Sequence, residues 1–180
     1  MTAEDRLAEL RSKVDTFFTR VAARYPGQLA CAPGCADCCR GELTVTAVEA
    51  AGIARAVSAL APAARAELAR RARDGTPCVA LDADGRCAVY EARPIVCRSH
   101  GVPLRFTEPS PDGKRSLPVL DACSKNFTGM ALTAVDPGSI LDQQTLSVVL
   151  GGIDALFAQE TGRPRGARPP LRDVILAAAD

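Results

Sequence analysis

Eight cysteines and one histidine are the side chains of this 180-residue chain whose types and spacing point to chemistry. The first four cysteines form the pattern C-x3-C-x2-C-C, three more follow as C-x8-C-x9-C, and the last comes after another 25 residues. Thiolates are soft ligands, and four of them in a tetrahedral array suit zinc, iron or an iron–sulfur cluster. We therefore predict a metal centre whose candidate ligands are Cys31, Cys35, Cys38, Cys39, Cys78, Cys87, Cys97 and Cys123.

Structural disulfides are the main alternative use of so many cysteines. Disulfide-rich folds are typically short and secreted, whereas this chain is of middle size. Its first residues, from Met1 to Arg6, include acidic side chains and do not lead into the apolar core of a secretory signal. Clustered thiols in a reducing compartment bind metal or do redox chemistry. We therefore expect a cytoplasmic protein with reduced cysteines.

The spacing leaves the ligand set open. Adjacent Cys38 and Cys39 point in different directions in most backbone conformations, so we expect them to serve different centres, or one to be a ligand and the other its neighbour. Eight thiols suffice for two four-coordinate centres, or for one centre with spare thiols. The partition that we expect joins Cys35, Cys38, Cys78, Cys87 and Cys97, and leaves as further ligands or spares Cys31, Cys39 and Cys123.

Three established cysteine motifs fit poorly. The first three cysteines have the spacing of the radical S-adenosylmethionine cluster loop, but they follow a helix, Asp37 replaces the usual aromatic residue, and the chain is too short for that fold. The ferredoxin spacing C-x2-C-x2-C-x3-C-P does not match. Paired zinc-ribbon knuckles are absent, because only Cys35 and Cys38 stand at the C-x2-C step.

Two segments together resemble a known family. Cys31 to Cys39 is followed by a stretch from Gly85 to Arg98 that reads G-x-C-x-x-Y-x-x-R-P-x-x-C-R. This combination resembles the YkgJ-like cysteine-cluster proteins, described as carrying a zinc- or iron-chelating CxxCxxCC-type domain, over residues 28–125. The resemblance implies metal chelation by the cysteines. Flagellin lysine methylases look similar over the cysteine motif and are associated with an iron–sulfur cluster.

Three further side chains are candidates for the surroundings of the centre. Arg93 and Arg98 can donate hydrogen bonds to metal-bound thiolates or to nearby carbonyl groups, and donors of this kind tune a metal centre. Either arginine could equally well form an ion pair on the surface. His100 follows Cys97 by three residues and can reach the same centre, but the thiols already supply enough ligands, so we place it beside the ligand set.

The pattern of apolar residues predicts helices that flank and interrupt the cysteines. We expect a helix over 3–25 capped by Thr2, and a second that opens with the capping box Thr46 to Glu49 and carries Ile53, Val57 and Leu60. We also expect a helical turn starting at Pro94 and a long helix over 139–160, with a face that comprises Leu146, Val149, Leu150, Ile153 and Phe157. The other expected elements are helices from Pro62 to about Arg73 and over 171–179, a hairpin of 78–81 with 86–90, and a second hairpin turning at Asp112-Gly113.

These expectations combine into one interpretation. The chain is a mainly α, helical single domain over residues 1–180, with a small β-hairpin and irregular loops around a cysteine-ligated metal centre within residues 28–125. The expected function is metal binding, with an iron–sulfur cluster favoured over a zinc or iron ion. The alternatives are a protein-modifying, methylase-like enzyme that uses an iron–sulfur centre, and a structural zinc module for a protein partner. A net charge of +1 argues against nucleic acid, no apolar stretch is long enough to span a membrane, and no catalytic residue is assigned.

Overall fold

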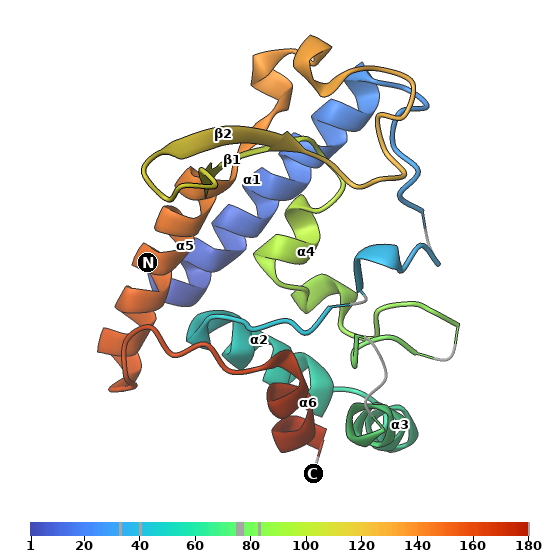
Figure 1. Cartoon of the computed structure of the whole chain (residues 1–180). Coiled ribbons are helices and arrows are strands. Elements are labelled where there is room, and N and C mark those ends of the chain that lie inside the picture. Colours follow the sequence, from blue (N-terminus) through green and yellow to red (C-terminus); the bar gives the residue numbers. More distant parts are fainter. Residues whose placement is uncertain (33, 40, 75–77, 83, 180) are drawn as a thin grey trace.

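The computed structural model describes residues 1–32, 34–39, 41–74, 78–82 and 84–179 (Figure 1). Within those residues the chain is mainly α-helical with one small sheet, as the sequence predicts. The helices are α1 (Ala3–Arg24), α2 (Ala47–Ser58), α3 (Pro62–Arg73), α4 (Ile95–Ser99), α5 (Gln143–Thr161) and α6 (Leu171–Ala179). The strands are β1 (Leu104–Pro109), β2 (Ser116–Asp121) and β3 (Leu141–Asp142), and short 3-10 turns include η1 (Asp37–Cys39) and η2 (Tyr90–Ala92).

The long helices α1 and α5 lie side by side and share one apolar cluster (Figure 1). In α1, Leu7, Leu10 and Val14 recur on one face because the helix repeats every 3.6 residues, and all three are buried. Thr2 and Asp5 form the predicted capping box, which satisfies backbone N–H groups at the start of the helix. From α5, the buried residues of this cluster are Leu146, Ile153 and Phe157.

A second apolar cluster holds α2, α3 and α6 together at the other end of the molecule (Figure 1). Ile53 and Val57 of α2 are fully buried there, beside Leu68 of α3 and Ile175 of α6. The chain reaches α6 through the segment near Pro170, which makes a β-bridge to Thr44. This bridge brings the start of α6 next to the chain that follows η1, and so next to the cysteines.

The sheet has the order β2-β1-β3, with β1 antiparallel to β2 and parallel to β3. The predicted second hairpin is confirmed, because β1 and β2 pair from Leu104↔Asp121 to Pro109↔Ser116 and turn at Gly113 with φ +68°. The predicted first hairpin is present in a shorter form: Leu81 and Cys87 make an antiparallel bridge, flanked by hydrogen bonds from the N–H of Asp82 to the Arg86 carbonyl and from the N–H of Ala88 to the Ala80 carbonyl, both at 2.8 Å. The Asp82 carboxylate accepts the N–H groups of Asp84 and Arg86 and closes a tight loop, and the chain turns again in η2.

Other differences from the sequence prediction are at helix ends. The long helix begins at Gln143 and not at 139, because the preceding residues form a 3-10 turn and β3, and the Asp142 carboxylate caps the N–H of Thr145 at 2.8 Å. Val149 was expected on the buried face of this helix but is 44% exposed. Helix α2 ends at Ser58, so Leu60 lies beyond it, partly buried against the same cluster. Helix α3 has the predicted bounds, Pro62 to Arg73.

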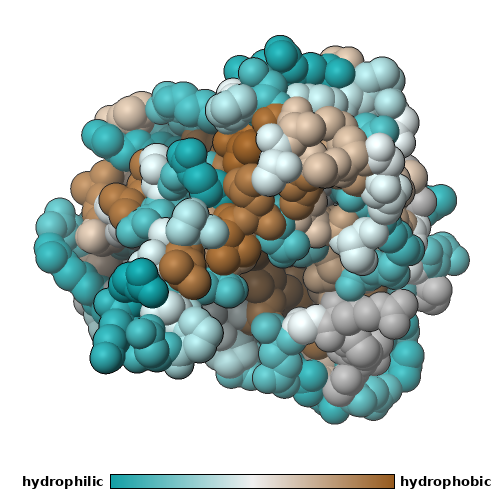
Figure 2. Space-filling model, turned by 45° about the horizontal axis from the view of Figure 1, so that its top comes forward, coloured by the Kyte–Doolittle hydropathy of each residue, from teal (hydrophilic) through white to brown (hydrophobic). Residues whose placement is uncertain are grey.

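The outer surface is mixed in character. Figure 2 shows hydrophilic side chains around the periphery of one face and apolar side chains gathered near its centre, where the surface is hollowed. Among the described residues, none of the helices combines the length and apolar character required to cross a lipid bilayer.

Candidate metal centre

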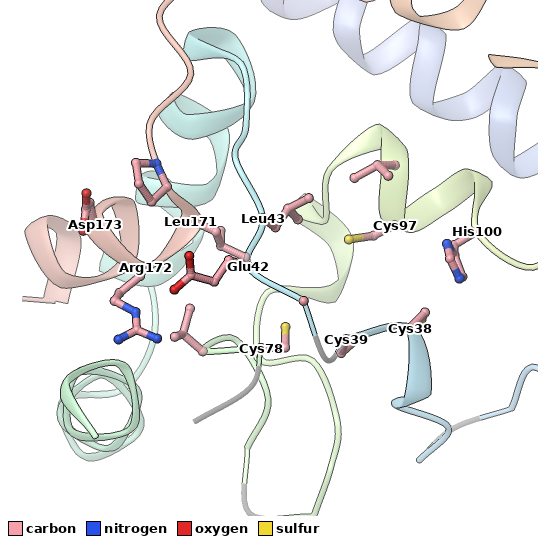
Figure 3. Close-up of a pocket in the computed structure, with 14 residues that line it drawn as sticks. Cys38, Cys39, Glu42, Leu43, Cys78, Cys97, His100, Leu171, Arg172 and Asp173 are labelled. Carbon is pink, nitrogen blue, oxygen red and sulfur yellow. The ribbon is translucent and has the colours of Figure 1, made fainter. Parts of the chain in front are cut away.

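Four of the cysteines line one pocket of about 450 Å³ (Figure 3). Cys38 and Cys39 come from η1, Cys78 from the loop that follows α3, and Cys97 from α4. Figure 3 places these four residues toward one end of the pocket, with Arg172 and Asp173 of α6 toward the other. The rest of the lining is Gly41, Glu42, Leu43, Val79, Val96, His100, Pro170 and Leu171. Three segments that are distant in sequence thus bring four thiols to a common cavity.

Cys78 has a strained backbone conformation. Its φ of +37° lies in the left-handed region, which residues other than glycine seldom adopt, and strain of this kind is concentrated at functional sites. The Cys78 thiol interacts with the Cys39 side chain and with the backbone N–H groups of Ala80 and Leu81, and together these hydrogen bonds lower its pKa to about 6. The surrounding chain therefore favours the thiolate form of Cys78, which is the form that binds metal.

Cys39 is the partner of Cys78. The Cys39 thiol donates the hydrogen bond, which raises the pKa of Cys39, and burial and the neighbouring thiols raise it further. Burial also raises the pKa of Cys38, and the charges of Cys31 and Cys35 add to this effect. We expected Cys38 and Cys39 to serve different centres, or one to be a ligand and the other its neighbour, and the structure places both in the lining of the same pocket. The 3-10 turn of η1 accounts for this, since it keeps the two adjacent residues on one short, tightly wound segment.

Cys97 faces the same group of thiols from α4. Burial raises its pKa to about 12, and the charges of Cys78, Cys87 and Cys38 act in the same direction. Cys87 is also buried, which raises its pKa, and it lies near Cys78 without lining the pocket. Thiols that disfavour one another's ionisation become thiolates together only when a cation offsets their charge. A bound metal ion or cluster supplies that charge.

The position of α4 depends on a buried carboxylate. Glu49 is 2% exposed, and its side chain accepts hydrogen bonds from the backbone N–H and the hydroxyl of Thr46 in the predicted capping box. The other oxygen of the same carboxylate accepts the N–H of Ile95 at 2.8 Å, at the first turn of α4. Glu49 therefore joins the start of α2 to the start of the short helix that carries Cys97.

Replacement of Glu49 tests this link. In Glu49→Ala the N–H groups of Thr46 and Ile95 lose their buried acceptor, so the free energy of unfolding should fall by about 2–4 kcal/mol. Glu67→Ala is the matched control, because Glu67 pairs with Arg70 on the exposed surface of α3 and its loss should cost at most about 1 kcal/mol. Urea denaturation of both variants measures the difference. Equal losses of stability would contradict the proposed link.

The arginines contact oxygen atoms. The Arg98 side chain, 6% exposed, donates to the carbonyls of Arg93 and Glu91 and forms an ion pair with Asp15 of α1. The guanidinium of Arg93 lies 3.8 Å from the centre of the Tyr90 ring, and its charge acts on the buried Cys87 thiol. Arg98 thus fixes α4 to α1 through its ion pair with Asp15. Its contacts to carbonyl groups agree with one of the two roles predicted for it. His100 is exposed and lies in the pocket lining.

The remaining three cysteines lie elsewhere. The Cys31 sulfur accepts a hydrogen bond from the Asn126 side chain at 3.3 Å, and Cys35 and Cys123 interact electrostatically with Lys125. All eight cysteines are described and none is in a disulfide. Of the five cysteines that the expected partition joins, Cys38, Cys78 and Cys97 line the pocket together with Cys39, while Cys35 and Cys87 do not line it.

The donor set fits a thiophilic metal. Across the described residues, no three Cys, His, Asp or Glu side chains converge closely enough to hold a single metal ion in the present conformation. The four cysteines instead line one end of a cavity, and the backbone of Ala80 and Leu81 favours the negative charge of the Cys78 sulfur. Soft sulfur ligands with N–H donors around them suit zinc, iron and iron–sulfur centres.

Comparison with protein families agrees with this chemistry. Residues 30–112 match the family model CxxCxxCC, described as a "putative zinc- or iron-chelating domain". The resemblance expected from the cysteine spacing is confirmed, and the matched segment contains every cysteine except Cys123. This match supports metal binding in general terms. Comparisons with curated proteins and with solved structures give no match.

Two contacts that position segments carrying cysteines could not be predicted from the sequence. Asn126 is 5% exposed and contacts Cys31, but an isolated asparagine in a loop gives no pattern to detect. Glu49 was recognised as part of a capping box, and its second contact, to Ile95, spans 46 residues. A motif search identifies the local role of such a side chain and misses the distant one.

Proposed function

We propose that the protein binds an iron–sulfur cluster in the pocket, through Cys38, Cys39, Cys78 and Cys97, which we call the pocket centre. The observation that carries this proposal is the arrival of four thiols from η1, the loop after α3 and α4 at one cavity. Four cysteine thiolates are the usual ligands of iron–sulfur clusters. Such a cluster would supply one-electron chemistry, and the chain's part is to hold, bury and tune it.

The spread of the thiols favours a cluster over a single ion. A tetrahedral zinc site needs all four sulfurs within about 2.3 Å of one point. The four pocket thiols lie toward one end of the cavity, and among the described residues no three such side chains meet at one point. In a four-iron cluster each thiolate binds a different iron, so the ligands stand farther apart. The separation of the thiols therefore supports the larger group.

The chain's own groups have distinct tasks at this centre. The backbone of Ala80 and Leu81 stabilises the negative charge of the Cys78 sulfur. Helix α4, fixed by Glu49 and Arg98, holds Cys97 in a buried position. Thiolate ligands require a reducing environment, so the proposal includes a cytoplasmic location.

The visible spectrum and metal content of the anaerobically purified protein test the proposal. We expect a coloured protein that contains iron and acid-labile sulfide in similar amounts. The same sample after treatment with a strong chelator is the matched control, and should be colourless. A colourless purified protein that contains only zinc would contradict the cluster and favour the structural zinc module. A protein that holds no metal after anaerobic purification would contradict metal binding altogether.

A further inference from the structure

The end of the pocket away from the thiols carries charged side chains that the metal centre does not use (Figure 3). Arg172 and Asp173 come from the first turn of α6, and Glu42 comes from the chain between η1 and α2. Within the described residues, neither the Arg172 guanidinium nor the Glu42 carboxylate forms a hydrogen bond or an ion pair with the protein. Two opposite charges therefore line one cavity without being paired there.

A short antiparallel pairing fixes the backbone on which these two charges stand. Thr44 and Pro170 make the β-bridge that joins the chain after η1 to the start of α6. Glu42 precedes one member of the bridge by two positions and Arg172 follows the other by two, so the antiparallel direction brings both residues to the same end of the pairing. Leu171 is buried in the apolar cluster of α2, α3 and α6, which holds the first turn of α6 in place.

Apolar side chains form the wall between the charged end and the thiol end of the pocket. Leu43, Val79 and Leu171 all belong to the lining, and the N–H of Leu171 donates to the Leu43 carbonyl at 2.7 Å. The volume of about 450 Å³ is within the range of small-molecule sites, roughly 300–1,000 Å³. An apolar wall with a few charged groups at one end is typical of a site for a small organic molecule.

The charges select the kind of molecule that fits. A simple anion attracted by Arg172 would also meet the carboxylates of Glu42 and Asp173, and a simple amine attracted by these carboxylates would meet Arg172. A molecule that carries both charges close together satisfies both sides, and a guanidinium binds a carboxylate through two parallel hydrogen bonds. The carboxylate and the ammonium on the α-carbon of a free amino acid are such a pair.

We propose that this end of the pocket binds a free α-amino acid with an apolar side chain, and we call it the amino-acid site. The Arg172 guanidinium donates to the carboxylate of the ligand, and the Glu42 carboxylate accepts hydrogen bonds from its ammonium. The apolar side chain of the ligand lies along Leu43 and Val79. The inference goes beyond metal binding, and it rests on the proposed function only for what fills the thiol end of the cavity.

Isothermal titration calorimetry with each of the common free amino acids tests the amino-acid site, on full-length protein that is purified anaerobically and whose iron content is measured. We expect the wild type to bind at least one amino acid with an apolar side chain. The N-acetyl derivative of that amino acid lacks the ammonium and its amide lacks the carboxylate, so each should bind at least about tenfold more weakly. Arg172→Gln and Glu42→Gln should weaken binding of the unmodified amino acid to a similar extent. Arg163→Gln is the matched control, because Arg163 is exposed after α5 and outside the pocket lining, and it should bind as the wild type does.

Three outcomes would overturn the amino-acid site. If iron-loaded wild-type protein binds no amino acid, the amino-acid site is wrong while the pocket centre stands. If the amide or the N-acetyl derivative binds as tightly as the amino acid itself, the site recognises one end of a peptide and not a free amino acid. If Arg172→Gln and Glu42→Gln keep wild-type affinity, the amino acid binds elsewhere. Binding to metal-free wild-type protein that both variants lose would support the amino-acid site and contradict the pocket centre.

Discussion

Removal of the metal is expected to lower the melting temperature of the protein by about 10 °C or more. Metal binding to thiolates contributes folding free energy, roughly 10–16 kcal/mol for zinc in finger peptides, which is comparable with the whole stability of a typical domain. The described residues between Cys31 and Cys39 and between Cys78 and Cys87 contain little regular structure beyond η1 and the bridge Leu81↔Cys87.

The loss of structure should be confined to these segments. The cluster between α1 and α5 is built from residues such as Leu7, Val14 and Phe157, and includes no cysteine. Far-ultraviolet circular dichroism should therefore keep much of its helical signal after chelation, while hydrogen exchange becomes faster over 28–43 and 78–92. Chelator added to a variant that binds no metal is the control for direct effects of the chelator. An unchanged melting curve in demonstrably metal-free protein would contradict the coupling of metal and fold.

The helices could be predicted because their signals are local. Thr2 with Asp5 and Thr46 with Glu49 satisfy backbone groups within three residues, so the same contacts form wherever the helix packs. The apolar spacing of α1 likewise fixes its buried face. The turn at Gly113 could also be predicted from a local signal, because its positive φ depends on one glycine.

The grouping of the cysteines could not be predicted with the same success. Sequence spacing identifies all eight as candidates, but which thiols meet depends on how η1, the loop after α3 and α4 pack together. The pairing of Cys39 with Cys78 spans 39 positions, and no residue near Cys39 in the sequence predicts it. The first predicted hairpin is shorter than expected, because the chain turns into η2 at Tyr90 soon after the bridge between Leu81 and Cys87.

Loss of Cys97 should have the largest effect on metal binding at the pocket centre. Serine fits the space of cysteine, but its hydroxyl is a hard ligand that does not ionise near neutral pH, so it replaces a soft thiolate poorly. Helix α4 is held by Glu49 and Arg98, neither of which contacts the Cys97 sulfur, so Cys97→Ser should fold. His100 is exposed, and four thiols already line the pocket, so its removal should leave the metal in place.

Iron content per chain in Cys97→Ser and His100→Ala, both purified anaerobically beside the wild type, tests the pocket centre most directly. The arrangement of Cys38, Cys39, Cys78 and Cys97 predicts iron close to background in Cys97→Ser and at the wild-type level in His100→Ala. Full iron occupancy in Cys97→Ser, or a loss confined to His100→Ala, would contradict the assignment of the metal to this pocket's thiols.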